Sequence, residues 1–179
     1  MPCRWPPSQN NARSIDVCQI HDPAPEGDPA EVDRFASEVI ELSTRHNFVY
    51  WGALGAIYRS WACSTSGDTV KGIWGIEHGI RDYRATGAML SMPYLLTLKA
   101  EALYLADRTS EALEAISEAE VLVERFEERR CCAELHRLRG VFLTAIGADK
   151  AQIEASFSDA IRIAKEQSSV SLEKRAEAT

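Results

Sequence analysis

Apolar side chains recur at helical spacing along most of this chain, and residues 93–126 show the pattern most clearly. A short polar interruption at residues 107–109 separates two apolar stripes, each with the three- and four-residue steps of an α-helix. Pro93 suits a first helical turn, and Thr109 is expected to cap the second helix. The stripes consist of Tyr94, Leu95, Leu98, Ala102 and Leu105, then Ala112, Ile116, Ala119, Val123 and Phe126.

This pair of helices is expected to recur about every 40 residues. Gly67, Asp107 and Gly147 mark the same turn in three successive copies, and small residues recur at matching helix positions. Those small residues, which would let helix backbones approach closely, are Ser60, Gly72 and Gly79, then Ala100, Ala112 and Ala119, then Gly140 and Ala160. The same pattern predicts helices at 31–46, 48–65, 69–86 and within 131–167, and the start of another at 170–179.

The glycines of the first repeat weaken its helices unless close packing compensates for the lost propensity. We expect Gly72, Gly75 and Gly79 to be close-packing positions. Trp51 and two further tryptophans, Trp61 and Trp74, are large enough to fill the space around them.

Composition narrows the class of protein. The 179 residues are 45% hydrophobic and 26% charged, which is typical of a globular chain, and the net charge of −7 argues against nucleic-acid binding. The five cysteines form no disulfide framework or metal pattern, so a cytoplasmic location is predicted. No signal peptide or membrane span is indicated. Residues 1–29 hold six of the seven prolines and predict a disordered N-terminal tail.

Several short sequences resemble a known family. They are residues 82–87 (DYRATG), 93–94 (PY), 111–113 (EAL) and 133–140 (AELHRLRG). Together with the spacing of small residues, they resemble tetratricopeptide repeats, although the period is nearer 40 than about 34 residues. More specifically, residues 31–179 resemble the C-terminal repeats of large bacterial proteins that also carry a class III adenylate/guanylate cyclase domain and an AAA-type ATPase domain. Arg130-Cys131 departs from that family, which tends to have two tryptophans there.

The resemblance implies an all-α fold over residues 30–179. We expect a right-handed solenoid of about three helical hairpins that is truncated at both ends. Carrying over the groove positions of tetratricopeptide repeats predicts a concave peptide-binding face lined by Leu54, Ile57, Trp61, Tyr94, Thr97, Glu101, Glu134, Arg137 and Val141. The alternative is that flanking helices of a longer protein fill this groove.

A second candidate site is a row of cations. Arg59, Lys99 and Arg139 occupy the same place in three successive repeats, where they could hold an acidic peptide or a carboxylate terminus. The alternative, which we favour, is that they pair with Glu101, Glu134 and other acidic residues nearby on the solvated face.

Catalytic and metal-binding motifs are missing from the sequence. There is no phosphate-binding loop, nucleophile elbow or spaced His/Cys cluster, and the acidic runs read as solvated faces. We therefore expect a non-catalytic module without a cofactor that binds a protein or peptide partner, by resemblance a cyclase or ATPase domain. One alternative is an adenylate cyclase fragment whose catalytic domain lies elsewhere. Another is an oligomerisation element that self-associates through open solenoid ends.

Overall fold

A computed structural model describes residues 28–179, and this part of the chain is entirely helical. Most of the predicted tail, residues 1–27, lies outside the described residues. Its last two residues belong to the fold, because the Asp28 side chain caps the first helix and Pro29 opens it. The eight described helices are α2 (Pro29–His46), α3 (Val49–Thr65), α4 (Thr69–Ala85), α5 (Met92–Leu105), α6 (Thr109–Phe126), α7 (Cys132–Ala145), α8 (Lys150–Glu166) and α9 (Val170–Glu177).

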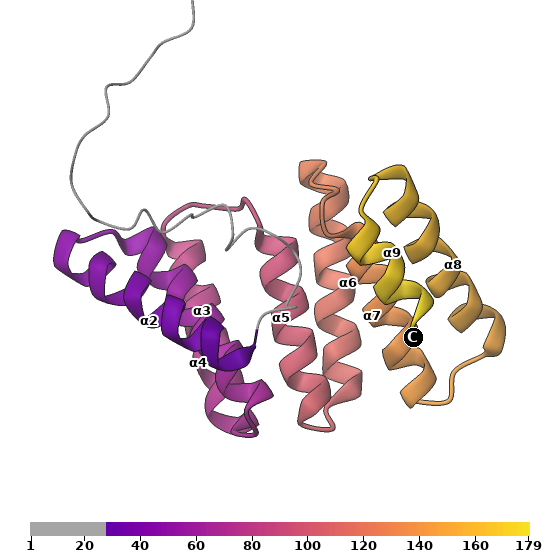
Figure 1. Ribbon diagram of the computed structural model, residues 1–179, viewed down its shortest axis with the longest axis horizontal. Helices are drawn as coiled ribbons and strands as arrows, with labels where there is room; N and C mark the ends of the chain where they lie inside the picture. The colour runs from indigo at the N-terminus through magenta and orange to yellow at the C-terminus, as the bar shows by residue number, and fades with distance from the viewer. Residues whose placement is uncertain (1–27) are drawn as a thin grey trace, which may run out of the picture.

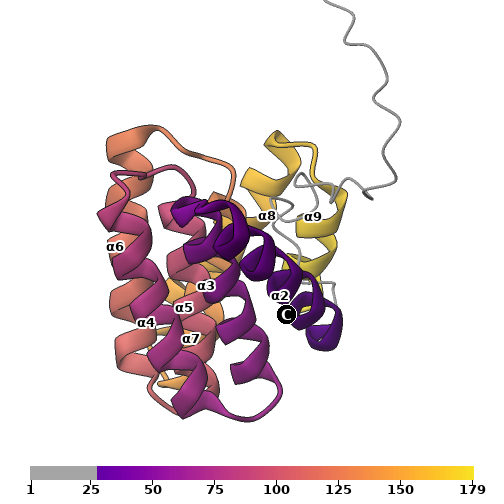
Figure 2. The same ribbon diagram turned by 90° about the vertical axis from the view of Figure 1, so that its left-hand side faces the viewer.

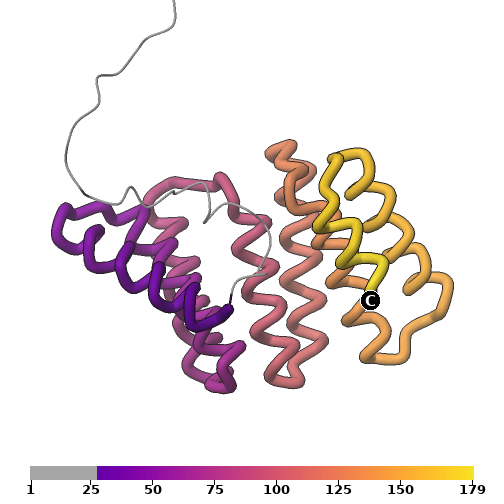
Figure 3. The backbone as a smooth tube through the Cα atoms, viewed as in Figure 1, coloured from indigo at the N-terminus to yellow at the C-terminus, as the bar shows by residue number. Residues whose placement is uncertain are grey.

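The helices follow one another along the long axis of the molecule (Figure 1). The smooth backbone trace runs from α2 at one end to α8 and α9 at the other (Figure 3). Each helix packs on its sequence neighbours, and α3, α5, α7 and α9 also contact one another in succession. Turned by 90°, the molecule shows α4 and α6 on one side with α3, α5 and α7 beside them (Figure 2). The predicted all-α class is thus confirmed.

The main core is continuous from α3 to α7, and a small second cluster of Ala133, Ala164 and Leu172 lies between α7, α8 and α9. The predicted stripe supplies three of the four buried residues of α6 but only three of the nine of α5, where Met92, Pro93, Leu96, Thr97, Ala100 and Leu103 are buried as well. The prediction that every stripe residue faces the core was wrong for Leu105 and Phe126, whose side chains are 49% and 43% exposed. Both are the last residues of their helices, where no neighbouring helix covers them.

Close approach between α3 and α4 confirms all three predicted close-packing glycines of the first repeat. A Cβ at Gly75 would lie 2.2 Å from Ser60 Oγ. A Cβ at Gly72 would lie 1.9 Å from Ser64 Oγ and 2.6 Å from the backbone oxygen of Ser60. A Cβ at Gly79 would lie 2.5 Å from a side-chain carbon of Ile57. The predicted role of the tryptophans was wrong, because serine and isoleucine line these contacts and Trp74 is 62% exposed.

The turns between helices share one backbone geometry. Gly67, Asp107 and Gly147 all have positive φ, as the predicted common turn requires, and a second series at residues 47, 87, 127 and 168 follows α2, α4, α6 and α8. The predicted cap Thr109 was wrong, because Arg108 holds the cap position and Thr109 is the first helical residue. Asp149 does cap α8, accepting a hydrogen bond from the N–H of Ala151 at 3.2 Å.

Candidate functional site

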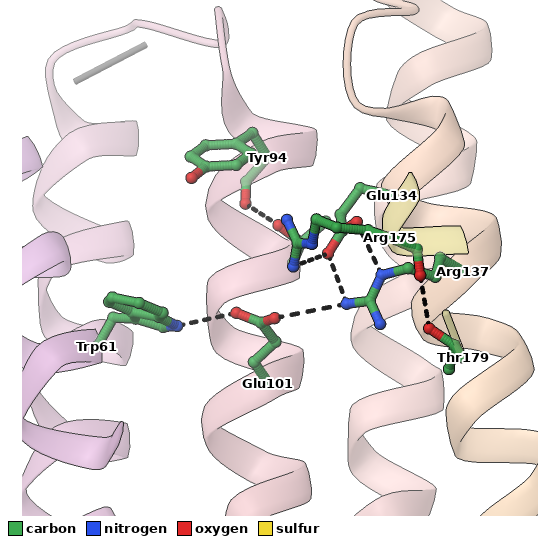
Figure 4. Close-up of polar contacts among 8 residues, drawn as sticks. Trp61, Tyr94, Glu101, Glu134, Arg137, Arg175 and Thr179 are labelled. Carbon is green, nitrogen blue, oxygen red and sulfur yellow. Dashed lines mark hydrogen bonds and ion pairs between the residues drawn. The ribbon is translucent and has the colours of Figure 1, made fainter. Parts of the chain in front are cut away.

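A chain of hydrogen bonds and ion pairs joins four alternate helices, α3, α5, α7 and α9, on one face of the molecule (Figure 4). Its members are Trp61 on α3, Glu101 on α5, Glu134 and Arg137 on α7, and Arg175 on α9. We call these five residues the interhelical network. They meet because α3, α5, α7 and α9 stack side by side, so residues far apart in sequence share one face.

Glu134 is the most heavily bonded member of the interhelical network. Arg137 donates to both its carboxylate oxygens, from Nε at 3.0 Å and from Nη2 at 2.7 Å. Arg175 Nη2 donates to Glu134 Oε1 at 3.0 Å. The Glu134 side chain is only 3% exposed, and such a buried carboxylate needs paired donors of this kind.

Glu101 is less completely bonded. Its Oε2 accepts the indole N–H of Trp61 at 2.9 Å, whereas its Oε1 lies 3.9 Å from Arg137 Nη2, beyond hydrogen-bond length. Burial raises the pKa of the Glu101 carboxyl, and the neighbouring Glu134 carboxylate raises it further. The Trp61 hydrogen bond and the two arginines act in the opposite direction without cancelling the rise.

The two arginines of the interhelical network differ in how well they are satisfied. Burial alone would lower the pKa of Arg137, but hydrogen bonds and attraction from Glu134 outweigh it, so the pKa of this guanidinium is raised. Arg175 is the opposite case. Its Nη1 is buried and has no hydrogen-bond partner among the residues that the structure describes.

Two tyrosines adjoin the interhelical network. The rings of Tyr58 on α3 and Tyr94 on α5 lie 6.4 Å apart between centroids, and both side chains are half-buried. Burial raises the pKa of each phenol well above its ordinary value. Tyr58, Glu101 and Glu134 raise the pKa of Tyr94 further.

The structure brings together only some of the nine residues predicted to line a groove. Trp61, Glu101, Glu134 and Arg137 are joined in the interhelical network, and Tyr94 lies next to it. Val141 is half-buried on α7. The prediction that all nine present a lining surface was wrong for three buried side chains outside the network, because they pack in the interior: Leu54, Ile57 and Thr97, at 2%, 0% and 2% exposure.

The predicted row of cations is divided among ion pairs between neighbouring helices. Lys99 Nζ lies 3.3 Å from Glu77 on α4, and Arg139 Nη1 lies 2.6 Å from Glu120 on α6. Arg59 is exposed on α3. Lys99 and Arg139 thus pair with nearby acids, as the favoured alternative predicted. The named partners Glu101 and Glu134 were wrong, because both carboxylates lie beside Arg137 instead.

Sequence reasoning missed Arg175 and Tyr58. In the 40-residue register Tyr58 aligns with Leu98 and Leu138, so a polar aromatic residue at an apolar position was a readable signal. Arg175 follows the one additional residue of the last copy, so it aligns with Glu134 itself, and no pattern in the sequence marks the two as partners.

Within residues 28–179, no group of three or more His, Cys, Asp or Glu side chains could hold a metal ion. Burial raises the pKa of the Cys131 thiol to about 12, so it stays protonated and unreactive at neutral pH. No described helix is both long and apolar enough to cross a lipid bilayer.

Comparison with known proteins adds one relative to this all-helical, stacked architecture. The chain is 26% identical over 141 residues to the "Uncharacterized protein R02095" of Rhizobium meliloti (strain 1021). The match covers 79% of this chain but only 14% of that protein. No protein-family model matches the chain, and no solved structure matches it.

Proposed function

We propose that this chain is a non-catalytic helical-repeat module, built in the manner of tetratricopeptide repeats, that binds a protein partner and serves regulation. The observation that carries the proposal is the interhelical network with Tyr58 and Tyr94 beside it, spread over α3, α5, α7 and α9. Aromatic and arginine side chains are the types that most often anchor protein interfaces. A face shared by several helices suits an extended partner segment.

Two further observations support a module rather than an enzyme. The relative from Rhizobium meliloti is much longer than the region matched, as expected where such a module is one part of a larger protein. Glu134 is paired with both Arg137 and Arg175 and its side chain is almost fully buried, whereas a catalytic acid or base needs access to a substrate. By the resemblance of residues 31–179, the partner is a cyclase or ATPase domain.

Partner capture tests the proposal. The full chain and two variants, Tyr94→Ala and Tyr104→Ala, would be used to capture cross-linked proteins from cells of the source organism, followed by quantitative mass spectrometry. Both tyrosines are half-buried on α5, but Tyr104 stacks on Phe142 at 4.9 Å and serves as the matched control. We expect a partner that Tyr94→Ala loses by at least about tenfold and Tyr104→Ala keeps.

Two assays separate this proposal from its alternatives. Formation of a cyclic nucleotide from ATP or GTP by the chain alone, with Mg²⁺ or Mn²⁺, would overturn the proposal of a non-catalytic module. Several apolar side chains are exposed, including Val70 at 81% and Val170 at 63%, so self-association is also measurable. Concentration-dependent mass in light scattering, without any captured partner, would favour the oligomerisation element.

A further inference from the structure

We propose that the interhelical network recognises an uncharged, extended peptide segment through the backbone N–H and C=O of one residue. This inference rests on the proposed function, because it names the chemistry of the partner that would bind at the same face. Glu101 Oε1 would accept the N–H, and Arg175 Nη1 would donate to the C=O.

The first argument is the balance of charge. The interhelical network holds two carboxylates, Glu101 and Glu134, and two guanidinium groups, Arg137 and Arg175. Their formal charges cancel, so the network attracts neither anionic nor cationic ligands strongly. A charged ligand would lose its water on this face and gain no compensating countercharge, which is costly in a partly buried site.

The second argument is the hydrogen bonds that remain to be made. Glu101 Oε1 is 3.9 Å from Arg137 Nη2 and so keeps its capacity to accept. Arg175 Nη1 is buried without a partner among the described residues, and leaving such a donor unpaired costs free energy. One acceptor and one donor together match the two polar groups of a peptide residue.

The third argument is the geometry of an extended chain. In a β-strand the N–H and C=O of one residue point to the same side, which is how paired strands exchange two hydrogen bonds. Glu101 on α5 and Arg175 on α9 flank the Glu134–Arg137 pair on α7 (Figure 4). An extended segment lying along this face would present both groups to them. The Arg175 side chain is 23% exposed, so turning its guanidinium would bring Nη1 to the surface.

Acidic and basic partners fit this face less well. A carboxylate placed here would face Glu101 and Glu134, whose mutual repulsion already raises the pKa of the Glu101 carboxyl. A lysine or arginine would face Arg137 and Arg175. The half-buried rings of Tyr58 and Tyr94, which lie 6.4 Å apart between centroids, instead offer one apolar surface to an uncharged side chain of the bound segment.

Peptide selection on the full chain tests the inference. A displayed library of random heptapeptides would be selected against the folded protein, and dissociation constants of the enriched peptides would be measured by fluorescence polarisation. We expect enriched sequences without charge at their central positions. Methylating the backbone nitrogen of the bound residue in a selected peptide should weaken binding by about tenfold or more, because it removes the donor to Glu101.

Protein variants assign the two hydrogen bonds. Glu101→Ala removes the acceptor, and Arg175→Lys keeps the positive charge beside Glu134 but removes Nη1. Each should weaken binding by about tenfold. Glu111→Ala and Arg162→Lys are matched controls at exposed positions on α6 and α8, and they should bind within about twofold of the unaltered chain.

Each contrary result would overturn the inference. In the selection, the contrary results are enriched peptides with a fixed Asp, Glu, Lys or Arg at the centre, or no enriched peptide at all. In the binding measurements, they are unchanged affinity for Glu101→Ala or Arg175→Lys, or affinity that survives every backbone methylation of the peptide. Methylated peptides are tested on the unaltered chain, so that result stands even if a variant fails to fold. A partner captured through Tyr94 together with any of these results would retain the proposed function and reject only this recognition chemistry.

Discussion

Glu101 carries a cost that the other carboxylate of the interhelical network avoids. Glu134 receives three hydrogen bonds from Arg137 and Arg175, whereas Glu101 receives one from Trp61. The Glu101 side chain is nevertheless only 20% exposed. A partly desolvated carboxylate with one good donor is less stable ionised than it would be in water, which is why the pKa of this group is raised.

This cost predicts an unusual pH dependence for Glu101. Because its pKa is higher in the folded than in the unfolded chain, the folded state binds the proton more tightly. The free energy of unfolding of the unaltered chain, minus that of Glu101→Gln, should therefore fall as pH rises from about 4.5 through the folded pKa. Urea denaturation at several pH values between about 4 and 8 measures this difference.

Glu111 provides the control of opposite sign. Its pKa is lowered by the hydrogen bond from Arg108, so Glu111→Gln should lose stability relative to the unaltered chain as pH rises. A Glu101 difference that rises with pH instead would show that attraction from Arg137 outweighs burial.

At the scale of residues, the sequence predicted the members of the site better than their contacts. The repeat register picked out Trp61, Glu101, Glu134 and Arg137, because equivalent helices present equivalent positions. It did not predict that Glu134 would be buried, since a glutamate beside an arginine usually lies in solvent. Which carboxylate is enclosed depends on α9 packing over α7, a tertiary contact that no local pattern records.

Among the elements, α3 and α4 are the pair whose packing depends most on small side chains. A Cβ at Gly72 would overlap Ser64 Oγ and the backbone of Ser60 and Ser64, whereas a Cβ at Gly52 would meet only Ser43 Cβ at 3.5 Å. Both glycines lie within helices, where glycine is less favourable than alanine. Only at Gly72 does the missing side chain allow two helices to pack closely.

Alanine substitutions should therefore change stability in opposite directions. Gly72→Ala should lower the free energy of unfolding by about 1–3 kcal/mol, because α3 and α4 must separate to admit the methyl group. Gly52→Ala should raise it by about 0.5–1 kcal/mol through helix propensity. Urea denaturation followed by circular dichroism measures both. Equal effects of the two substitutions would contradict the close approach at Gly72.

The existence and order of the elements were predictable because apolar periodicity and turn residues agree in every repeat. The expected helix at 69–86 ends one residue early at Ala85, and α5 begins at Met92 rather than Pro93. Caps were harder to predict. Thr109 has a capping side chain, but the chain turns one residue earlier because Asp107 adopts positive φ. Trp74 was misassigned because helical spacing does not say which face of α4 meets α3.

Over the whole molecule, stability is expected to be uneven. The main core joins α3 to α7, whereas the second cluster consists of Ala133, Ala164 and Leu172 with Ile163 packed against it. In stacked helical arrays each unit is stabilised mainly by its neighbours, so the unit with the smaller buried surface opens more readily.

Hydrogen exchange should report this difference. We expect the amides of α9 to exchange fastest, those of α8 next, and those of α5 slowest, and mass spectrometry of the full chain can resolve these segments. Leu172→Ala should speed exchange in α8 and α9 while leaving α5 unchanged, because its contacts lie in the second cluster. Uniform exchange across α5, α8 and α9 would show one cooperative unit instead.

The all-α architecture was predictable at this scale because local helices and short turns leave few other arrangements. The division into a large and a small core was not. Both halves of the chain show the same 40-residue period, and only the packing reveals that α8 contributes few buried side chains beyond Ser156, Ala160 and Ala164.

The positions of the turns bear on how such a chain could have grown by gene duplication. Helices α3, α5 and α7 end at residues 65, 105 and 145, whereas α4, α6 and α8 begin at 69, 109 and 150. The loop between α7 and α8 is therefore one residue longer than the equivalent loops before α4 and α6, and the additional residue does not lie within a helix. Inside a helix, one inserted codon would rotate everything after it by about 100°. In a loop, an inserted residue does not change which face either helix turns toward its neighbours, so copies of unequal length can still stack.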